Sequence, residues 1–145
     1  MSDDTTLRIE RTYGAPIHAV FEAWTSEEVI RRWWELERGW GTTEAELDLR
    51  VGGAVRVVMR DPGKDIEYGG GGTYTEIEPP NRLAFTWVWD GDTRRTLIEI
   101  DLEETGGATV VRFTQRDLWD EEALRSHEQG WTQILDNLGR MVETT

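Results

Sequence analysis

Cysteine is absent from this chain of 145 residues, which excludes disulfide bonds, thiolate nucleophiles and thiolate metal ligands. Histidine is nearly absent, because only His18 and His127 occur and they lie far apart in the sequence. Structural metal sites need clustered ligands, so we expect no zinc site and no other metal or cofactor. The serines Ser2, Ser26 and Ser126 lack the G-x-S-x-G context of a hydrolase nucleophile, and no catalytic residue is assigned.

Basic residues are outnumbered, with 16 Lys and Arg against 29 Asp and Glu, which gives a net charge of −13. The arginines are scattered along the chain instead of forming one stripe, and a chain of this charge repels phosphate backbones. We therefore expect no nucleic-acid partner. Lys64 is the single lysine, a composition that fits either a GC-rich coding background or adaptation to salt.

Long apolar runs are also missing, because no segment approaches the roughly 20 apolar residues that span a bilayer. We therefore expect no membrane insertion. The start of the chain, MSDDTTLRIE, has neither a basic region nor an apolar stretch, so no signal peptide is expected and the expected location is cytoplasmic. The composition, 37% hydrophobic and 31% charged, predicts one globular domain over residues 1–145.

Aromatic residues, by contrast, are abundant, and the chain contains eight tryptophans. Two of them, Trp87 and Trp89, continue a spacing of two that begins with Leu83 and Phe85. A β-strand would place these four large apolar side chains on one face. Such a face must be covered by another element of the structure.

The last segment, residues 121–142, is the best candidate for this cover. Its apolar positions recur at spacings of three and four, which is typical of one helical stripe. The residues of the stripe are Leu124, His127, Trp131, Ile134, Leu138 and Met141. The sequence therefore predicts a curved sheet closed by one long terminal helix.

The order of the remaining elements predicts an α+β domain. A strand at 7–12 precedes helices at 15–24 and 25–34, and from residue 42 the apolar spacing changes to two through about six strands. The glycines at 69–72 predict sharp curvature or a bulge and not a phosphate cradle, because no Lys-Ser/Thr pair follows them. Successive strands joined by short turns favour one antiparallel sheet.

Five segments, in this order, resemble a known family: the family named for the activator of the heat-shock-protein-90 ATPase. It belongs to the larger START-like, polyketide-cyclase-like group of helix-grip proteins. The resemblance extends from about residue 8 to residue 142. The segments are FEAWTSEEVIRRWW, DLRVGGAVRVVM, GTYTEIEPPNRLAFTW, GGATVVRFTQRDL and HEQGWTQILDNL.

This resemblance implies a Bet v 1-like helix-grip fold, in which a bent antiparallel sheet holds the C-terminal helix and a cavity lies between them. The group includes ligand carriers, aromatase/cyclases and chaperone regulators, so the fold alone implies no single function. Such proteins often pair, which makes a homodimer an expectation. A histidine is common in the family where Gln115 stands, and an amide cannot exchange protons near neutral pH.

The cavity is predicted to be lined by aromatic, adaptable and polar side chains. Indole rings suit a planar ligand, a thioether deforms to fit, and Tyr, Gln and His can orient a ligand through hydrogen bonds. The predicted ligand-binding residues are Trp33, Met59, Tyr74, Trp87, Trp89, Gln115, Trp119, His127, Trp131 and Ile134. The alternative for each tryptophan is that it fills the core, and for His127 that it is a hydrogen-bonded structural histidine.

These observations favour a non-enzymatic carrier or sequestering protein that binds a small hydrophobic ligand, aromatic or polycyclic, between the sheet and the terminal helix. One alternative is an interaction protein that regulates a chaperone ATPase, as the resemblance implies for the activators themselves. Another is an aromatase/cyclase-type enzyme in which Tyr74, Gln115 or His127 polarises a carbonyl group of the substrate.

Overall fold

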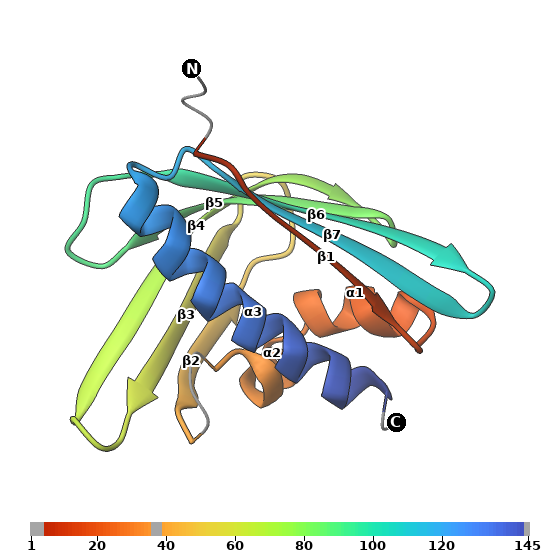
Figure 1. Cartoon of the computed structure of the whole chain (residues 1–145), viewed down its shortest axis with the longest axis horizontal. Coiled ribbons are helices and arrows are strands. Elements are labelled where there is room, and N and C mark those ends of the chain that lie inside the picture. The colour runs from red at the N-terminus through yellow and green to blue at the C-terminus, as the bar shows by residue number, and fades with distance from the viewer. Residues whose placement is uncertain (1–4, 36–38, 144–145) are drawn as a thin grey trace.

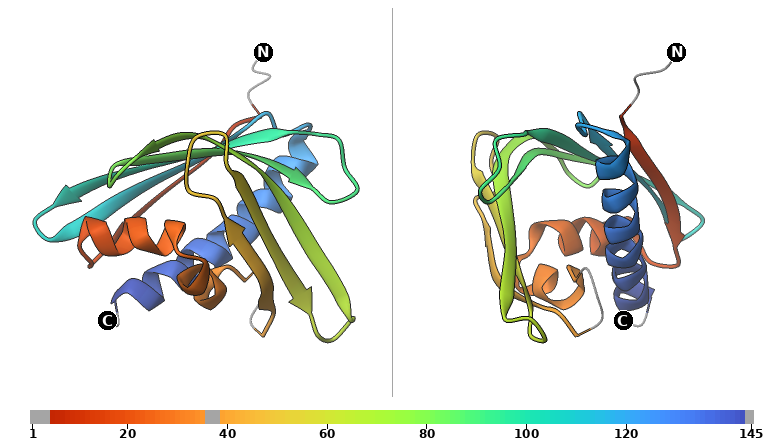
Figure 2. Two further views of the ribbon diagram at one scale, coloured as in Figure 1. Left: turned by 180° about the vertical axis from the view of Figure 1, so that it is seen from behind. Right: turned by 60° about the vertical axis from the view of Figure 1, so that its left-hand side comes forward.

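One sheet of seven antiparallel strands bends around the long helix α3 in the computed structural model, which describes residues 5–35 and 39–143 (Figure 1). Helices α1 and α2 lie with α3 on the concave side of the sheet (Figure 2). The strand order is β1-β7-β6-β5-β4-β3-β2. The elements are β1 Leu7–Tyr13, α1 Ile17–Thr25, α2 Glu27–Trp33, β2 Gly41–Leu47, β3 Ala54–Asp61, β4 Ile66–Glu78, β5 Arg82–Trp89, β6 Thr96–Thr105, β7 Ala108–Arg116 and α3 Glu121–Glu143.

The predicted α+β helix-grip fold is confirmed, including six strands after the two short helices. In β5, Leu83, Phe85 and Trp87 are buried, and Trp89 at the end of the strand is half-buried. The side chains at this spacing of two therefore lie on the concave face of the sheet, as expected. Among the described residues, no helix has the length and apolar character needed to cross a bilayer.

Helix α3 lies close against β1 along its C-terminal half. The hydroxyl of Tyr13 donates to the carbonyl oxygen of Leu135 at 2.7 Å. Gly139 allows this approach, because a Cβ at that position would lie 2.8 Å from the Tyr13 ring. Leu138, on the predicted stripe, is fully buried beside them. These contacts hold the C-terminal half of α3 against the sheet.

The glycine run lies inside β4 and brings this strand close to β5. A Cβ on Gly70 would lie 2.6 Å from the ring of Trp87, and a Cβ on Gly72 would lie 2.0 Å from the carbonyl oxygen of Thr86. Only glycine allows such contacts without a shift of the backbone. The register between β4 and β5 changes just after the run, which confirms the predicted irregularity of this strand.

Ser26 separates the two short helices and caps the second one. Its Oγ accepts a hydrogen bond from the backbone N–H of Val29 at 3.2 Å, and two acidic residues occupy the first turn of α2. Helix α2 ends at Trp33, and Trp34 leaves helical geometry with φ −81° and ψ 82°. Consequently Trp33 packs edge-on against Trp24, whereas Trp34 turns toward the sheet.

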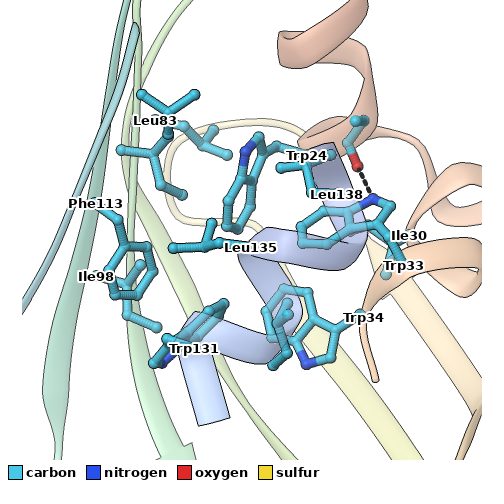
Figure 3. Packing of buried hydrophobic residues seen from close by; sticks show 14 of the residues in the cluster. Trp24, Ile30, Trp33, Trp34, Leu83, Ile98, Phe113, Trp131, Leu135 and Leu138 are labelled. Atoms are coloured by element: carbon cyan, nitrogen blue, oxygen red, sulfur yellow. Dashed lines mark hydrogen bonds between the residues drawn. The ribbon is translucent and has the colours of Figure 1, made fainter. Parts of the chain in front are cut away.

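A cluster of aromatic rings fills most of the space between the helices and the sheet (Figure 3). Ring centroids are 4.7 Å apart for Trp24 and Trp33, 5.1 Å for Trp34 and Trp131, and 4.4 Å for Phe113 and Trp131. All five residues are buried. Aromatic pairs in such arrangements stabilise a core beyond the burial of their area. Much of the high tryptophan content is therefore explained by core packing.

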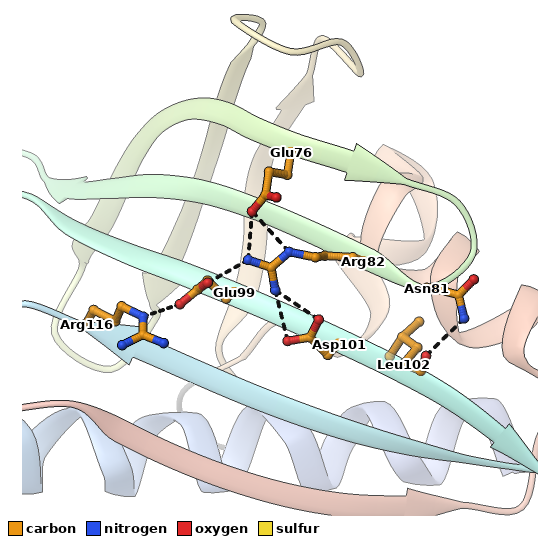
Figure 4. A network of polar contacts seen from close by, with 7 residues as sticks. All are labelled: Glu76, Asn81, Arg82, Glu99, Asp101, Leu102 and Arg116. Atoms are coloured by element: carbon orange, nitrogen blue, oxygen red, sulfur yellow. Dashed lines mark hydrogen bonds and ion pairs between the residues drawn. The ribbon is translucent and has the colours of Figure 1, made fainter.

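A network of ionic contacts lies on the convex face of the sheet, away from α3 (Figure 4). Arg82 of β5 contacts Glu76 at 2.7 Å, Glu99 at 2.6 Å and Asp101 at 2.9 Å, and Arg116 pairs with Glu99. These residues come from the neighbouring strands β4, β5, β6 and β7. The network ties the strands together on the outside while the concave side stays apolar.

Trp24 and Trp33 offer a test of the core, because they pack on each other and differ in their hydrogen bonds. Trp33 donates its indole N–H to the carbonyl oxygen of Ala23 at 3.0 Å, whereas Trp24 Nε1 is buried without a partner. We expect Trp33→Phe to lower the free energy of unfolding by about 1–3 kcal/mol more than Trp24→Phe, since only the former breaks a buried hydrogen bond. Urea denaturation of both variants measures the difference, and an equal or larger loss for Trp24→Phe would contradict this assignment.

Candidate functional site

A small pocket lies between the N-terminal half of α3 and the strands β3, β4 and β5. Its volume is about 190 Å³. The lining side chains are mostly apolar, and none of them carries a formal charge when His127 is neutral. They are Trp34, Met59, Tyr68, Trp87, Trp89, Ser126, His127, Gly130, Trp131 and Ile134.

The inner end of the pocket is held by a chain of buried hydrogen bonds. Trp131 donates its indole N–H to Gln115 Oε1 at 3.0 Å, and Gln115 Nε2 donates to Thr96 Oγ1 at 2.9 Å. The Thr96 hydroxyl then donates to the carbonyl oxygen of Trp87 at 3.2 Å. This chain connects α3 to β7, β6 and β5, so it sets the position of the Trp131 ring.

The outer end of the pocket is bridged by a second hydrogen bond between sheet and helix. Trp89 donates its indole N–H to His127 Nε2 at 3.1 Å. An indole nitrogen can only donate, so Nε2 must be the unprotonated nitrogen, and Nδ1–H donates to the carbonyl oxygen of Ala123 at 2.7 Å. Burial lowers the pKa of His127, against the opposing effect of its bond to Ala123. The histidine is therefore neutral in this arrangement.

Trp119 supports this bridge from outside the pocket. Its ring meets that of His127 edge-on, with centroids 5.4 Å apart. Arg94 covers the other side, with its guanidinium carbon 3.9 Å from the centre of the Trp119 ring. Arg94 is also paired with Asp92. Arg94 and Asp92, the charged groups next to Trp119, thus lie outside the pocket.

Six of the ten residues predicted to bind a ligand line this pocket. The structure brings together Met59, Trp87, Trp89, His127, Trp131 and Ile134. The other four lie elsewhere. Trp33 is in the core near α1, Tyr74 packs edge-on against Phe85, Gln115 is buried behind Trp131, and Trp119 lies outside the bridge.

Four lining residues are outside the predicted set: Trp34, Tyr68, Ser126 and Gly130. The sequence does contain a signal for Tyr68, because it follows the spacing of two backward from Tyr74 through the glycine run. No periodic signal distinguishes Trp34 from its neighbour Trp33, since the end of α2 decides which way each ring points.

A second hollow lies on the outside of the sheet, over β2, β3, β4 and β5, with a volume of about 740 Å³. It is wide and open to solvent, and most of its acidic groups have partners within the chain. Asp90 pairs with Arg56, Asp48 with Arg50, and Glu27 accepts the backbone N–H of Leu47. This surface is therefore a poor candidate for an enclosed ligand site.

No group of three or more His, Cys, Asp or Glu side chains within residues 5–35 and 39–143 could hold a metal ion. The pocket itself offers one neutral imidazole, two hydroxyl groups and several indole rings. Such a set can enclose and orient an apolar molecule by stacking and hydrogen bonding. It contains no charged acid or base in contact with the enclosed space.

Comparison with known proteins agrees with this geometry. The pattern of the family described as Activator of Hsp90 ATPase homolog 1-like protein matches residues 14–143. The chain belongs to this family. The match confirms the resemblance seen in the sequence and covers α1 through α3. A search of curated proteins finds no match.

Several solved structures share the fold. A protein from Chromobacterium violaceum is 26% identical, with a TM-score of 0.88, over 95% of this chain and 97% of that chain. The AHSA1 protein from Silicibacter pomeroyi is 27% identical, with a TM-score of 0.83, over 96% and 98%. An AHSA1-like protein from Aeromonas hydrophila is 30% identical, with a TM-score of 0.76, over 95% and 93%.

The bridge from Trp89 to His127 predicts a specific response to acid. The pKa of His127 is lowered in the folded protein below the value of about 6.5 of an unfolded chain, so the unfolded chain binds the proton first. The contribution of neutral His127 to stability is therefore complete above about pH 6.5 and is lost as pH falls below it. We expect His127→Gln to lose less stability than the wild type between pH 7.5 and pH 5, as measured by urea denaturation.

The matched control is His18→Gln, because His18 is exposed in α1. This variant should keep the pH dependence of the wild type. If His127→Gln and the wild type lose the same stability on acidification, the proposed bridge does not depend on a neutral histidine.

Proposed function

We propose that the protein binds a small, flat, apolar molecule in the pocket between α3 and the sheet and acts as a carrier or sequestering protein. The observation that carries the proposal is an uncharged hollow walled by the indole rings of Trp34, Trp87 and Trp131. Aromatic faces of this kind favour planar ligands. Carriers of hydrophobic ligands occur in the wider helix-grip group, so membership in the family supports the proposal.

The size of the pocket limits the size of the ligand. Its volume of about 190 Å³ is below the roughly 300–1,000 Å³ of typical sites for drug-sized ligands. This volume favours a molecule with one or two rings over the larger polycyclic ligands included in the expectation from sequence. The packed aromatic cluster behind Trp131 leaves little room for a larger guest.

The contacts favour binding over catalysis. Of the residues proposed to polarise a carbonyl group, Tyr74 and Gln115 lie outside the pocket, and His127 Nε2 already accepts a hydrogen bond. A general acid or base must reach the reacting group with a free position for the proton. A chaperone partner and a homodimer stay predictions from the resemblance.

Filling the pocket should weaken binding. Gly130 lines the pocket on α3, so Gly130→Leu would place a side chain in the space meant for the ligand. A leucine also suits a helix better than a glycine. We expect naphthalene to bind the wild type and to bind Gly130→Leu at least about tenfold more weakly, a change of about 1.4 kcal/mol. The shifts of the indole resonances in ¹⁵N–¹H spectra measure both affinities.

The matched control is Gln129→Leu, which introduces the same side chain one residue earlier at an exposed position of α3. It should bind naphthalene as the wild type does. Undiminished binding by Gly130→Leu would place the ligand outside this pocket and contradict the proposal.

A further inference from the structure

Two tryptophans of the pocket keep their hydrogen-bond donors unused. Trp33, Trp89 and Trp131 donate to Ala23, His127 and Gln115, respectively. Within the described residues, the indole N–H groups of Trp34 and Trp87 donate to no protein acceptor, although each residue is only 2% exposed. Indole N–H groups that are this deeply placed usually find a partner.

These two donors belong to residues of the pocket wall, and they are not sealed from solvent. Among the described side chains, Trp24 Nε1 is the one buried nitrogen without a partner, so the N–H groups of Trp34 and Trp87 are not sealed inside the core. Both residues line the pocket. Figure 3 shows the Trp34 nitrogen on the side of its ring that faces away from Trp24 and Trp33.

Three acceptors near the pocket are already in use. Gln115 Oε1 accepts from Trp131, and His127 Nε2 accepts from Trp89. The carbonyl oxygen of Trp34 accepts from the hydroxyl of Thr42 at 2.6 Å. The inner wall therefore presents donors without a protein acceptor, which an oxygen of the ligand can satisfy. The hydroxyl groups of Tyr68 and Ser126 can rotate to serve as donor or acceptor.

Charge restricts the ligand further. None of the lining residues is a cation, and Arg94 beyond Trp119 is paired with Asp92. The chain as a whole carries a net charge of −13. A carboxylate in the pocket would lose its hydration without gaining a positive partner, which is strongly unfavourable.

We propose that the ligand is an uncharged planar molecule with a carbonyl-type oxygen that accepts hydrogen bonds from the indole N–H groups of Trp34 and Trp87. This inference rests on the proposed function, because it names the chemical class bound at the same site. The aromatic walls select the flat ring system, and the two N–H groups select the position of its oxygen.

Three molecules of one bicyclic skeleton separate these requirements: indane, 1-indanone and indane-1-carboxylate. Affinities are measured by isothermal calorimetry on the whole chain. We expect 1-indanone to bind about 5- to 150-fold more tightly than indane, which corresponds to two net hydrogen bonds of about 0.5–1.5 kcal/mol each. Indane-1-carboxylate should bind more weakly than indane. Equal binding of indane and 1-indanone would overturn this inference and leave the proposed function intact, whereas no binding of either would overturn both.

The variants Trp34→Phe and Trp87→Phe test whether the indole N–H groups cause the preference for 1-indanone over indane. Each keeps an aromatic ring in the wall and removes one N–H donor. Each should reduce the ratio of indane to 1-indanone dissociation constants. The matched control is Trp24→Phe, which removes an indole N–H outside the pocket and should leave the ratio unchanged. A ratio that is unchanged in both pocket variants would overturn the assignment.

The wild-type protein offers a readout that needs no substitution in the pocket. On saturation with 1-indanone, the Nε1 protons of Trp34 and Trp87 should move downfield in ¹⁵N–¹H spectra. The Nε1 protons of Trp33 and Trp131, which already donate to the protein, should move much less. Tightest binding of the carboxylate, or downfield shifts of Trp33 or Trp131 instead, would overturn the inference.

Discussion

The hydrogen bond from Trp131 to Gln115 is the contact on which the site depends. Gln115 lies fully buried on β7, accepts from the helix and donates to Thr96, which in turn donates to the backbone of β5. Every member of this chain has a partner, which is the condition under which a buried polar network gives a unique arrangement. An amide supplies both an acceptor and a donor without a change of charge, so the connection is insensitive to pH.

The Trp131 ring separates the packed core from the pocket in the space between sheet and helix. Behind its ring the cluster with Trp24 and Phe113 is closely packed, and Tyr13 and Gly139 bring the rest of α3 against β1. In front of its ring, Gly130 of α3 lines the pocket without a side chain, opposite the indole rings of Trp34 and Trp87. The size of the pocket is therefore set by the packing around it.

Periodicity in the sequence predicted a curved sheet closed by a terminal helix, and the family resemblance implied the helix-grip fold. The spacing of two in β5 and the stripe of α3 each define a face, and two complementary apolar faces have few ways to combine. The site was predicted only in part, because periodicity gives the face of a residue and not its depth in a bent sheet. Tyr74 and Gln115 point to the concave side as expected, but the packed rings separate them from the pocket.

Trp33 and Trp34 show that periodicity also fails to predict the direction of a side chain at the end of a helix. Both are buried, yet the backbone of Trp34 leaves helical geometry and directs its ring to the pocket.

The most direct test of the account is a crystal structure of the protein soaked with 1-indanone. We predict electron density for the ring system between Trp34, Trp87 and Trp131, with α3 in place on the sheet. Density on the outer face of the sheet, or a pocket closed by its own side chains, would contradict the account.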